Sequence, residues 1–351
     1  MSKAPMRILL LNYEFPPVGG GAATASAEIA AHMVSQGAEV AVLTSHLAGL
    51  PHREIRHGYT VQRVRVMRRK PDRCSLPEMG AFIVGATVPA LRLAGEFKPD
   101  VMHVFFGMPT GPVGLAVNRL KGIPYLLSLR GDDVPGRQGG ALALAHRLMW
   151  PLTLQVWSRA SRLVVNGEGL KQRAENTLPR RPIQLVPNGV DTELFRPRTE
   201  RETSETVHLL FVGRLHRQKG LDYLLRGIAA LPPNLRQRVQ LELVGSGPAE
   251  EELRALVGTL CLGTIVRFRG WVPRHEIAPH YAAADIFVFP SFEEGMPNVV
   301  LEAMSSGNPV VATDIPGVRE LVQSESNGLL VPPANAEAFT AALTRLMNND
   351  E

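Results

Sequence analysis

Two glutamates late in the chain, Glu294 and Glu302, have the residue type and spacing to hold a hydroxyl-rich ligand beside an anion. A short apolar run before them predicts a strand, and a helix is expected to follow, with Asn298 as its N-cap and Gly307 at its end. Glu302 then lies about one turn inside the helix, with Glu294 ahead of it. The amides of residues 296–299 can face an anion while the carboxylates bind hydroxyls on either side. The alternative is a solvated Glu294, with Glu302 in a helix-terminal contact.

Arg214 and Lys219 form a second candidate site, in the stretch Gly-Arg-Leu-His-Arg-Gln-Lys-Gly of residues 213–220. This stretch follows the first strand expected in the second half of the chain. A guanidinium fork and a compact ammonium charge at one place suit a diphosphate, because together they match its geometry and its charge. Ordinary surface charge would account for the two residues equally well.

A glycine-rich loop forms the third candidate site, at residues 16–24 (Pro-Pro-Val-Gly-Gly-Gly-Ala-Ala-Thr). Glycines let the backbone approach a ligand closely, and the N-terminus of the following helix presents free N–H groups to a phosphate. The loop is not a dinucleotide-binding fingerprint, because Thr24 stands where Gly or Ala is required and the next strand does not end in an acidic residue. A tight turn without a ligand is the alternative.

The elements that must position these residues are short apolar runs between longer helical patterns. Strands are predicted at 7–12, 39–44, 100–104, 125–129 and 162–166, and an amphipathic helix at 23–36 is capped by Gly37. In the second half, strands are predicted at 208–212, 240–244, 265–268, 286–289 and 309–313. Such strands, apolar almost throughout and alternating with helices, indicate parallel sheets covered on both faces. We therefore predict an α/β protein of two doubly wound domains, with ligands at the carboxyl ends of the strands in the cleft between them.

Length and composition agree with two packed domains. The chain has 351 residues, of which 45% are hydrophobic and 20% charged. A polar stretch at 191–206 indicates where the domains meet. The predicted divisions are an N-terminal domain at 1–188, a linker at 189–206, a C-terminal domain at 207–332 and a C-terminal helix within 333–351.

Several protein classes are excluded. The two cysteines, Cys74 and Cys261, are too few and too far apart for a disulfide framework or a structural zinc site, so we expect an intracellular protein. The apolar run 8–11 is too short for a signal peptide. The nearest candidate for a membrane span, 79–91, is closed by Arg92 and is expected to be a buried helix.

The charge is divided unevenly along the chain. Residues 1–190 contain 23 Lys and Arg against 12 Asp and Glu, a net charge of +11, whereas residues 191–351 contain 15 against 21, a net of −6. The excess is concentrated in 53–73, where valine and arginine partly alternate at 61–66, as on a half-exposed strand. This segment is either a solvated basic face or a patch that meets anionic lipid headgroups or a phosphorylated acceptor. We expect no nucleic-acid partner, because no interleaved aromatic residues or binding motif accompany the charge.

Taken together, the motifs resemble those of the family-4 (group 1) retaining glycosyltransferases of the GT-B fold. Glu294 and Glu302 match that family's Glu-x7-Glu motif, with Pro-Ser-x-x-Glu-Gly around the first glutamate and Leu-Glu-Ala-Met around the second. Further landmarks occur in the family's order: the N-terminal glycine loop, Val-Pro-Asn-Gly-Val-Asp at 186–191, the stretch 213–220, Gly-Ser-Gly-Pro at 245–248, Phe-Arg-Gly-Trp-Val at 268–272 and Tyr-Ala-Ala-Ala-Asp at 281–285. The resemblance covers nearly the whole chain.

The resemblance implies two Rossmann-like domains facing across a cleft, with a nucleotide-diphosphate sugar on the second domain and the acceptor on the first. Arg214 and Lys219 would clamp the diphosphate, Glu302 the ribose hydroxyls and Glu294 the sugar hydroxyls. The remaining donor-binding positions implied are Gly295, Met296, Pro297 and Asn298 at the phosphate and sugar, Gly270, Trp271 and Val272 near the base, and Gly19 and Gly20 at the donor phosphate across the cleft.

The implied reaction breaks the bond between the anomeric carbon and the phosphate, so negative charge grows on the diphosphate leaving group. A preorganised Arg/Lys clamp can stabilise that charge as a metal ion does elsewhere, and the sequence has no Asp-x-Asp motif. We therefore expect no metal and no cofactor beyond the nucleotide sugar. The acceptor is expected to be a saccharide or a lipid-linked saccharide in cell-envelope polysaccharide or glycoconjugate synthesis. We expect the protein in the cytoplasm, at the inner face of the membrane where its acceptor is lipid-linked.

Two features depart from the family pattern. Many members carry a histidine in the first domain close to the transferred sugar, whereas this chain has Arg130 followed by Gly131, Asp132 and Asp133. An arginine cannot act as a base, although Arg130, with Asp132 and Asp133, stays a candidate for the acceptor side. His103 is a further candidate, with packing at a strand end as its alternative role. The second departure is the C-terminus: family members usually continue through further helices, the last of which crosses back to the N-terminal domain, whereas this sequence shows one helical pattern after residue 333. We expect either looser domain closure or a truncated chain.

Two other functions remain open. A non-catalytic protein that binds sugar nucleotides as a scaffold would bind the donor without transfer. A sugar-nucleotide 2-epimerase of the same fold would turn over the donor alone. A dehydrogenase is disfavoured by the incomplete glycine fingerprint.

Overall fold

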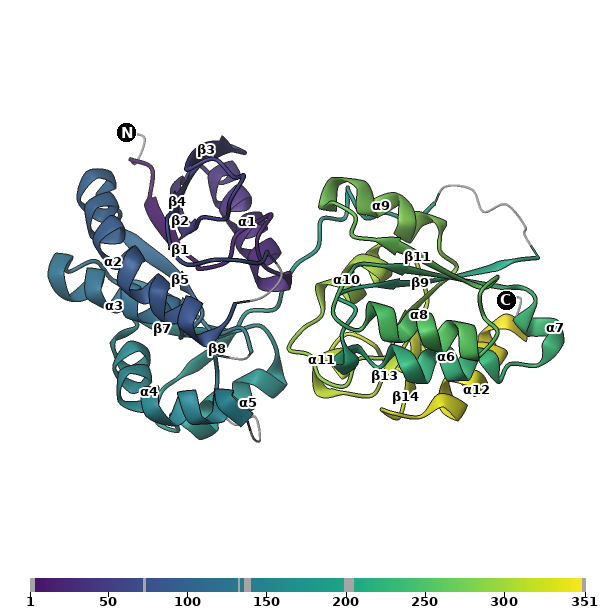
Figure 1. The fold of residues 1–351 in the computed structure, drawn as a ribbon. Coiled ribbons are helices and arrows are strands. Elements are labelled where there is room, and N and C mark those ends of the chain that lie inside the picture. The colour runs from purple at the N-terminus through teal and green to yellow at the C-terminus, as the bar shows by residue number, and fades with distance from the viewer. Residues whose placement is uncertain (1–3, 72–73, 132, 136–139, 199–204, 349–351) are drawn as a thin grey trace. The chain divides into compact units, whose positions relative to one another are not determined.

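The computed structural model describes residues 4–71, 74–131, 133–135, 140–198 and 205–348. The chain forms two compact units, Met1–Pro187 and Asn188–Glu351, each with its own sheet and its own apolar core. Figure 1 shows the first unit in purple to teal and the second in green to yellow.

The first unit is built on an eight-stranded sheet of order β3-β4-β2-β1-β5-β6-β7-β8. All neighbours in it are parallel except β3 and β4, which form an antiparallel edge. Its strands are β1 (Arg7–Leu11), β2 (Glu39–Ser45), β3 (Arg53–Arg56), β4 (Tyr59–Val64), β5 (Val101–Phe105), β6 (Tyr125–Ser128), β7 (Arg162–Val165) and β8 (Ile183–Leu185). The inner strands are buried almost throughout, as expected for a sheet covered on both faces.

Helices connect these strands, as parallel pairing requires. They are α1 (Gly21–Ser35), α2 (Leu76–Phe97), α3 (Thr110–Lys121), α4 (Gly140–Arg159) and α5 (Glu168–Thr177). The predicted cap at Gly37 is confirmed: its φ is +87°, its N–H donates to Val34 O at 2.9 Å, and the N–H of Ala38 donates to Met33 O at 3.0 Å. This is a Schellman motif, which closes the helix end.

The second unit has a six-stranded, fully parallel sheet of order β11-β10-β9-β12-β13-β14. Its strands are β9 (Val207–Val212), β10 (Val239–Val244), β11 (Val266–Gly270), β12 (Ile286–Phe289), β13 (Val310–Thr313) and β14 (Gly328–Val331). Its helices are the short 3-10 helix η1 (Arg217–Lys219), α6 (Leu221–Ala229), α7 (Pro233–Arg236), α8 (Glu250–Thr259), α9 (Arg274–Ala283), α10 (Asn298–Ser305), α11 (Pro316–Arg319) and α12 (Ala336–Asn348). Phe195, in the segment expected to be a linker, is fully buried in the core of this unit.

The register of the second sheet determines which loops meet. Strand β12 pairs in parallel with β9, Ile286 opposite Leu209 and Phe287 opposite Leu210. Parallel neighbours end at the same edge of a sheet. The loops that follow β9 and β12 therefore emerge side by side, and these loops carry the Arg214/Lys219 stretch and Glu294.

The structure corrects two expectations about the first unit. The alternation at 61–66 does not form a half-exposed face, because Arg63 is buried on β4 and donates to Glu54 Oε1 at 2.5 Å and Pro51 O at 3.0 Å. Helix α2 is longer than the predicted run and only one of its faces is buried. Among the described residues, α2 is long and apolar enough to span a membrane by length and composition, with 22% of its most apolar window buried.

Candidate active site

The loop between β9 and α6 carries Arg214 and is shaped by glycines on the neighbouring turn. A Cβ on Gly245 would lie 1.9 Å from the carbonyl oxygen of Gly213, and one on Gly247 would lie 2.2 Å from that of Leu215. The N–H of Leu215 donates to Ser246 O at 3.0 Å. The Gly-Ser-Gly-Pro turn thus allows a backbone approach that no other residue permits. It fixes the path of Arg214, which is half-buried at the start of the loop.

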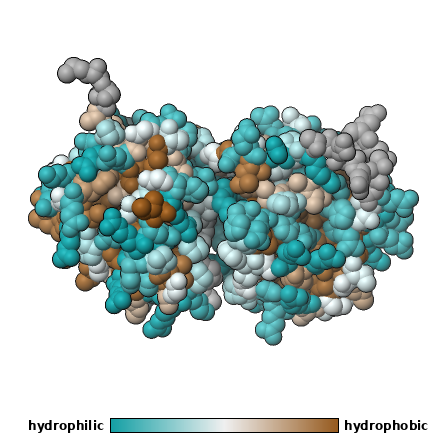
Figure 2. All heavy atoms as spheres, turned by 90° about the horizontal axis from the view of Figure 1, so that it is seen from above, coloured by the Kyte–Doolittle hydropathy of each residue, from teal (hydrophilic) through white to brown (hydrophobic). Residues whose placement is uncertain are grey.

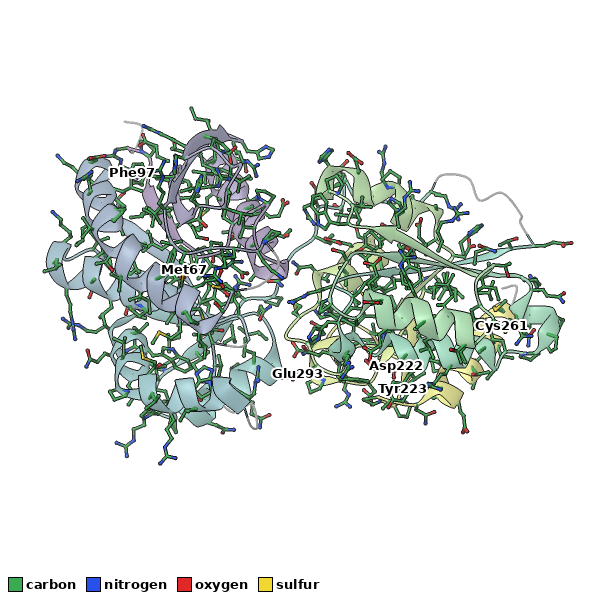
Figure 3. The ribbon with its side chains drawn as sticks, viewed as in Figure 1. Met67, Phe97, Asp222, Tyr223, Cys261 and Glu293 are labelled. Atoms are coloured by element: carbon green, nitrogen blue, oxygen red, sulfur yellow. The ribbon has the colours of Figure 1, made fainter. Side chains whose placement is uncertain are left out.

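Lys219 and Glu294 form an ion pair where this loop meets the loop after β12. Lys219 Nζ contacts Glu294 Oε1, which also accepts from Ser291 Oγ at 2.7 Å. The close approach of the two loops depends on Gly220, because its φ is +61° and a Cβ on it would lie 2.3 Å from Pro290 O. The side chains of Lys219 and Glu294 are 21% and 17% exposed, so the pair is accessible to a ligand. Glu293 is exposed beside it (Figure 3).

The N-terminus of α10 follows Glu294, as the sequence predicts, but the cap differs. Pro297 occupies the N-cap and Asn298 is the first helical residue, without a side-chain cap hydrogen bond. The prediction that Asn298 is the N-cap is therefore wrong. The helix ends as expected, with Gly307 at φ +76° and the N–H of Asn308 donating to Ala303 O at 3.0 Å.

Glu302 is buried in the first turns of α10, with both carboxylate oxygens engaged. Arg274 Nη1 donates to Oε1 at 2.6 Å, and the Tyr281 hydroxyl donates to Oε2 at 2.8 Å. Glu302 is 7% exposed at its side chain and Arg274 is 32% exposed, whereas Tyr281 is fully buried. Burial, followed by the Glu302 carboxylate, raises the pKa of Tyr281 well above its usual range. Of these two partners, Arg274 is therefore the one that solvent or a ligand can reach.

Asn188 braces the same loop, a contact that the sequence does not indicate. It lies in the Val-Pro-Asn-Gly-Val-Asp stretch. Its Nδ2 donates to Asn298 Oδ1 at 2.7 Å, and its backbone N–H to Met296 Sδ at 3.2 Å. A second brace comes from Gly317, whose Cβ would lie 2.0 Å from Gly295 O. Arg274 was also missed, because nothing in its local sequence indicates a carboxylate partner 28 positions away.

The residues expected near a nucleotide base lie at the end of β11. Gly270 has φ +78°, and its carbonyl accepts from the N–H of Gly245 at 2.8 Å. Trp271 follows it with 66% of its surface exposed, and Val272 is half-buried. The exposed indole lies three positions before Arg274, the partner of Glu302.

In the first unit, Glu14 and Pro71 contact the glycine loop and fix its position. Gly19 has φ +104°, and its Cβ would lie 2.8 Å from Glu14 Oε2. Its N–H donates to Pro71 O at 2.8 Å. Glu14 pairs with the buried Arg68 at 3.4 Å, and burial raises the pKa of Glu14 although Arg68 opposes that shift. Gly20, the N-cap of α1, is exposed.

The candidates for the acceptor side are mostly interior. His103 lies within β5, where its Nε2 contacts Ser128 Oγ at 2.7 Å, and burial, followed by the Arg130 charge, lowers its pKa to about 3. Asp133 is buried and accepts from the N–H groups of Gly107, Arg130 and Gly131 at 2.7, 2.9 and 2.9 Å. Through these contacts, Asp133 stabilises the loop that follows β6. Asp132 lies outside the described residues.

Arg130 is the accessible member of this group. It is half-buried over the ring of Phe105, 4.7 Å from its centroid. Burial lowers the pKa of its guanidinium to about 10, so it stays charged at neutral pH. Within the described ranges, no three His, Cys, Asp or Glu side chains gather in a way that would hold a metal ion.

Family models match the chain over almost its whole length. The model of Glycosyltransferase Family 4 matches residues 19–194, and that of Glycosyl transferases group 1 matches residues 206–349. A Bacillus subtilis protein described as a teichuronic acid biosynthesis glycosyltransferase is 31% identical, covering 84% of this chain and 73% of that protein. The D-inositol 3-phosphate glycosyltransferase of Frankia alni is 30% identical, covering 93% of this chain and 86% of that protein.

Solved structures share the architecture at lower identity. Sucrose-phosphate synthase from Thermosynechococcus elongatus superimposes with a TM-score of 0.83 at 22% identity, covering 98% of this chain and 90% of that one. Anabaena HepE, in complex with UDP and glucose, has a TM-score of 0.75 at 20% identity, with the same coverage. These neighbours confirm the predicted two-domain GT-B fold.

Proposed function

Because the chain belongs to the family-4 (group 1) glycosyltransferases, we propose that it transfers a sugar from a nucleotide-diphosphate sugar to a saccharide or lipid-linked acceptor. The reaction serves cell-envelope polysaccharide or glycoconjugate synthesis in the cytoplasm. It proceeds with retention of the anomeric configuration and without a bound metal ion. The observation that supports this most directly is the Lys219–Glu294 pair, placed ahead of the α10 N-terminus and Glu302.

The chemistry follows from the charges that develop. As the bond between the anomeric carbon and phosphate breaks, the diphosphate gains negative charge and the sugar becomes cation-like. Lys219 and Arg214 neutralise the leaving group, and the amides that begin α10 add the positive end of a helix dipole. These two cations, fixed on one loop, stabilise the charge of the leaving group as a bound divalent ion does in metal-dependent enzymes. Glu294, held between Lys219 and Ser291, accepts hydrogen bonds from sugar hydroxyls.

Glu302 is the residue that receives the ribose. Each of its oxygens has one of these partners and keeps acceptor capacity for a ribose hydroxyl. Tyr281 is fully buried, whereas Arg274 is about a third exposed, so the ribose reaches Glu302 from the side of Arg274. A front-side departure and attack needs no enzymatic base, so Arg130 in place of the family's histidine is compatible with transfer.

The first test is calorimetric titration of the chain with UDP, GDP and ADP in EDTA. One of the three is expected to bind without metal. Glu302→Ala should abolish or strongly weaken that binding, because it removes the ribose acceptor. Glu293→Ala is the matched control, since that exposed carboxylate neighbours the site and should leave binding unchanged.

The corresponding nucleotide sugars then separate the functions. Transfer to an added acceptor, with the anomeric configuration retained by NMR, supports the proposal. Release of an isomerised sugar without any acceptor would assign an epimerase. Binding without turnover, across an acceptor series that includes lipid-linked saccharides, would assign a scaffold. A requirement for a divalent cation would contradict the proposal that Arg214 and Lys219 stabilise the leaving group without a metal ion.

A further inference from the structure

The segment that leads into the second unit, residues 191–198, is fastened to that unit, and we call it the entry segment. It begins with a turn in which Asp191 Oδ1 accepts from the N–H groups of Glu193 and Leu194, each at 3.0 Å. The carbonyl of Asp191 accepts from the N–H of Phe195 at 2.9 Å. The carbonyl of Phe195 accepts in turn from Ser305 Oγ of α10. The turn therefore holds Phe195 against α10.

Further contacts follow along the entry segment. Pro197 lies against Gly307 at the end of α10, where a Cβ on the glycine would lie 3.2 Å from Pro197 Cβ. Arg198 Nη2 donates to Asp285 Oδ1 at 3.1 Å, immediately before β12. The entry segment is thus attached on both sides of Phe195, so the backbone of that residue has a fixed position in the second unit.

The ring of Phe195 contacts the two side chains that donate to Glu302. The ring of Tyr281 meets it edge to face, with 5.5 Å between the centroids and an angle of 88°. The guanidinium carbon of Arg274 lies 5.4 Å from the centroid of the Phe195 ring, within the range of a cation–π interaction. The same guanidinium donates to Glu302 Oε1 at 2.6 Å, and the Tyr281 hydroxyl donates to Oε2 at 2.8 Å. Phe195 and Glu302 therefore share both of these partners.

Phe195 acts on the site from the core and not by touching a ligand. Hydrophobic side chains are exposed at the surface of both units (Figure 2), whereas Phe195 is fully buried. Arg274 is about a third exposed, and a long side chain at the surface adopts many rotamers unless a neighbour restricts it. A planar guanidinium that lies over an aromatic ring is restricted in this way. The ring therefore limits where Arg274 can present its donors to Glu302.

We propose that Phe195 is a positioning residue of the nucleotide site: its ring holds the two donors of Glu302 and thereby orients that carboxylate toward the ribose hydroxyls. The inference rests on the proposed function, in which Glu302 receives the ribose. It adds a residue of the entry segment to those that determine how strongly the protein depends on a ribose. Without the ring, Glu302 keeps its charge but loses its fixed orientation, so the hydrogen bonds to the ribose weaken.

The dependence of binding on the ribose hydroxyls measures this role. UDP, GDP and ADP are titrated beside their 2′,3′-dideoxy counterparts, and the ratio of the two affinities is determined for the nucleotide that binds. The wild type should prefer the ribose form by about tenfold or more, since a hydrogen bond to a charged group contributes roughly that much. Phe195→Leu should lower the affinity for the ribose form by about tenfold and leave the dideoxy form unaffected, so the ratio approaches one. A wild-type ratio in Phe195→Leu would overturn the proposal.

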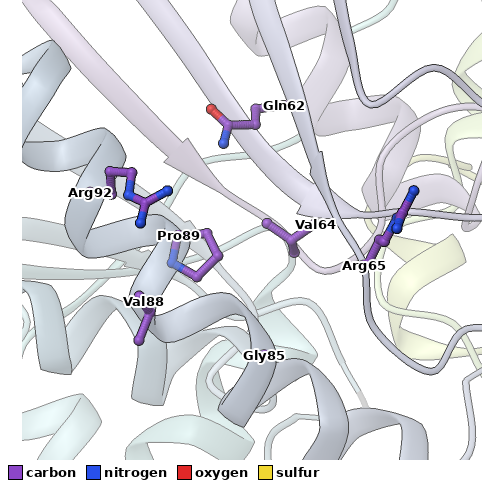
Figure 4. A pocket seen from close by; sticks show the side chains of 7 residues that line it. All are labelled: Gln62, Val64, Arg65, Gly85, Val88, Pro89 and Arg92. Carbon is purple, nitrogen blue, oxygen red and sulfur yellow. The ribbon is translucent and has the colours of Figure 1, made fainter.

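Two controls separate positioning from other effects. Phe339→Leu is the matched control, because Phe339 is equally buried in the same core, on α12. It should destabilise the unit as Phe195→Leu does but keep the wild-type ratio. The second control concerns a hollow of about 340 Å³ on the first unit, which Arg65 and Arg92 help to line (Figure 4). Arg65→Gln/Arg92→Gln should leave both affinities unchanged, and a loss would place the nucleotide in that hollow and overturn the proposal.

Thermal unfolding without nucleotide tests the same coupling. Because Phe195 and Glu302 act on the same two side chains, Phe195→Leu/Glu302→Gln should lower the unfolding midpoint by less than the sum of the two single losses. Phe339→Leu/Glu302→Gln should lower it by the full sum, and additive losses for the Phe195 pair would overturn the proposal. Phe195→Met repeats each measurement if the leucine variant does not fold. A wild type that binds none of the nucleotides would contradict the proposed function, and the unfolding midpoints would still decide whether Phe195 positions Glu302.

Discussion

Each unit places a carboxylate–cation pair beside the loop that follows its first strand, and the two pairs differ in enclosure. In the first unit, Glu14 and Arg68 have side chains 12% and 1% exposed. In the second unit, Lys219 and Glu294 are 21% and 17% exposed. Arg68 also donates from Nε to Lys70 O at 2.9 Å and from Nη2 to Pro71 O at 3.3 Å.

This difference separates a charge that holds the fold from a charge that can exchange partners. The enclosed pair ties the glycine loop to the connection before α2, and a ligand cannot replace either member without opening the core. The pair of the second unit lies where two loops meet at a sheet edge, so a diphosphate and a sugar can compete for it. Enclosure therefore predicts that the first pair governs stability and the second governs turnover.

The largest expected effect is on the enclosed pair. Arg68→Met should lower the free energy of unfolding of the first unit by about 3–5 kcal/mol, because it leaves the Glu14 carboxyl uncompensated in the interior. Urea unfolding followed by tryptophan fluorescence measures it, since Trp157 is fully buried in this unit. The double variant Glu14→Gln/Arg68→Met should recover part of the loss. Equal losses from Lys219→Met would erase the distinction between the pairs.

The second prediction concerns the accessible pair. Lys219→Ala should lower turnover of the nucleotide sugar by about 100-fold or more, because one fixed cation is lost from the leaving-group site. Its stability cost should stay below about 1 kcal/mol, as for other solvent-accessible ion pairs. Arg214→Ala should reduce turnover similarly. Release of nucleoside diphosphate measures both variants, and a near-normal rate would remove the residue from the clamp.

The third prediction extends the comparison to another enclosed group of the first unit. His103 has a pKa of about 3 in the folded chain and an ordinary value near 6.5 when unfolded. Between these values the unfolded state binds more protons, so stability falls as pH falls through this window and is unaffected above it. At pH 5 the loss is about 2 kcal/mol.

His103→Gln, which can still reach Ser128, isolates that contribution. The difference in unfolding free energy between wild type and variant should change with pH between 7 and 4, as measured by urea unfolding at each pH. A difference that stays constant across this range would show that His103 titrates normally. Arg130 is charged throughout and serves as the background common to both proteins.

The sequence predicts the inner strands because most of them are buried apolar runs flanked by Gly or Pro, a pattern that parallel sheets impose. It does not predict β3, β8 and β14, which lie at or form the edges of the two sheets and are short, with exposed or half-buried positions. It fails at Arg63, where an alternating pattern indicates exposure. The burial of that arginine depends on Glu54, which the antiparallel β3–β4 edge places opposite Val61, two residues from Arg63 on the same strand. A sequence pattern alone cannot show that an arginine is buried when its acidic partner lies on a neighbouring strand.

The candidate site divides along the same line. Glu294 and Glu302, and Lys219 in the stretch 213–220, are recognisable because each of these family motifs is local in sequence. Arg274 reaches Glu302 only because α9 and α10 lie together in the fold, and its local sequence gives no sign of it. Such long-range partners become visible only with coordinates.

The smallest expected effect tests how far the accessible pair depends on its support. Asn188→Ala removes the hydrogen bonds from Nδ2 to Asn298 Oδ1 and Met296 O and keeps the backbone N–H contact to Met296 Sδ, at a cost of about 1 kcal/mol in stability. Because these contacts hold the loop between Glu294 and α10, nucleotide affinity should also fall, by roughly three- to tenfold, as measured by calorimetry. Asn327→Ala is a control of the same type, since that side chain bonds within a turn at Leu321. An affinity loss equal for both variants would mean that general loosening of the unit, and not bracing of the loop, sets nucleotide binding.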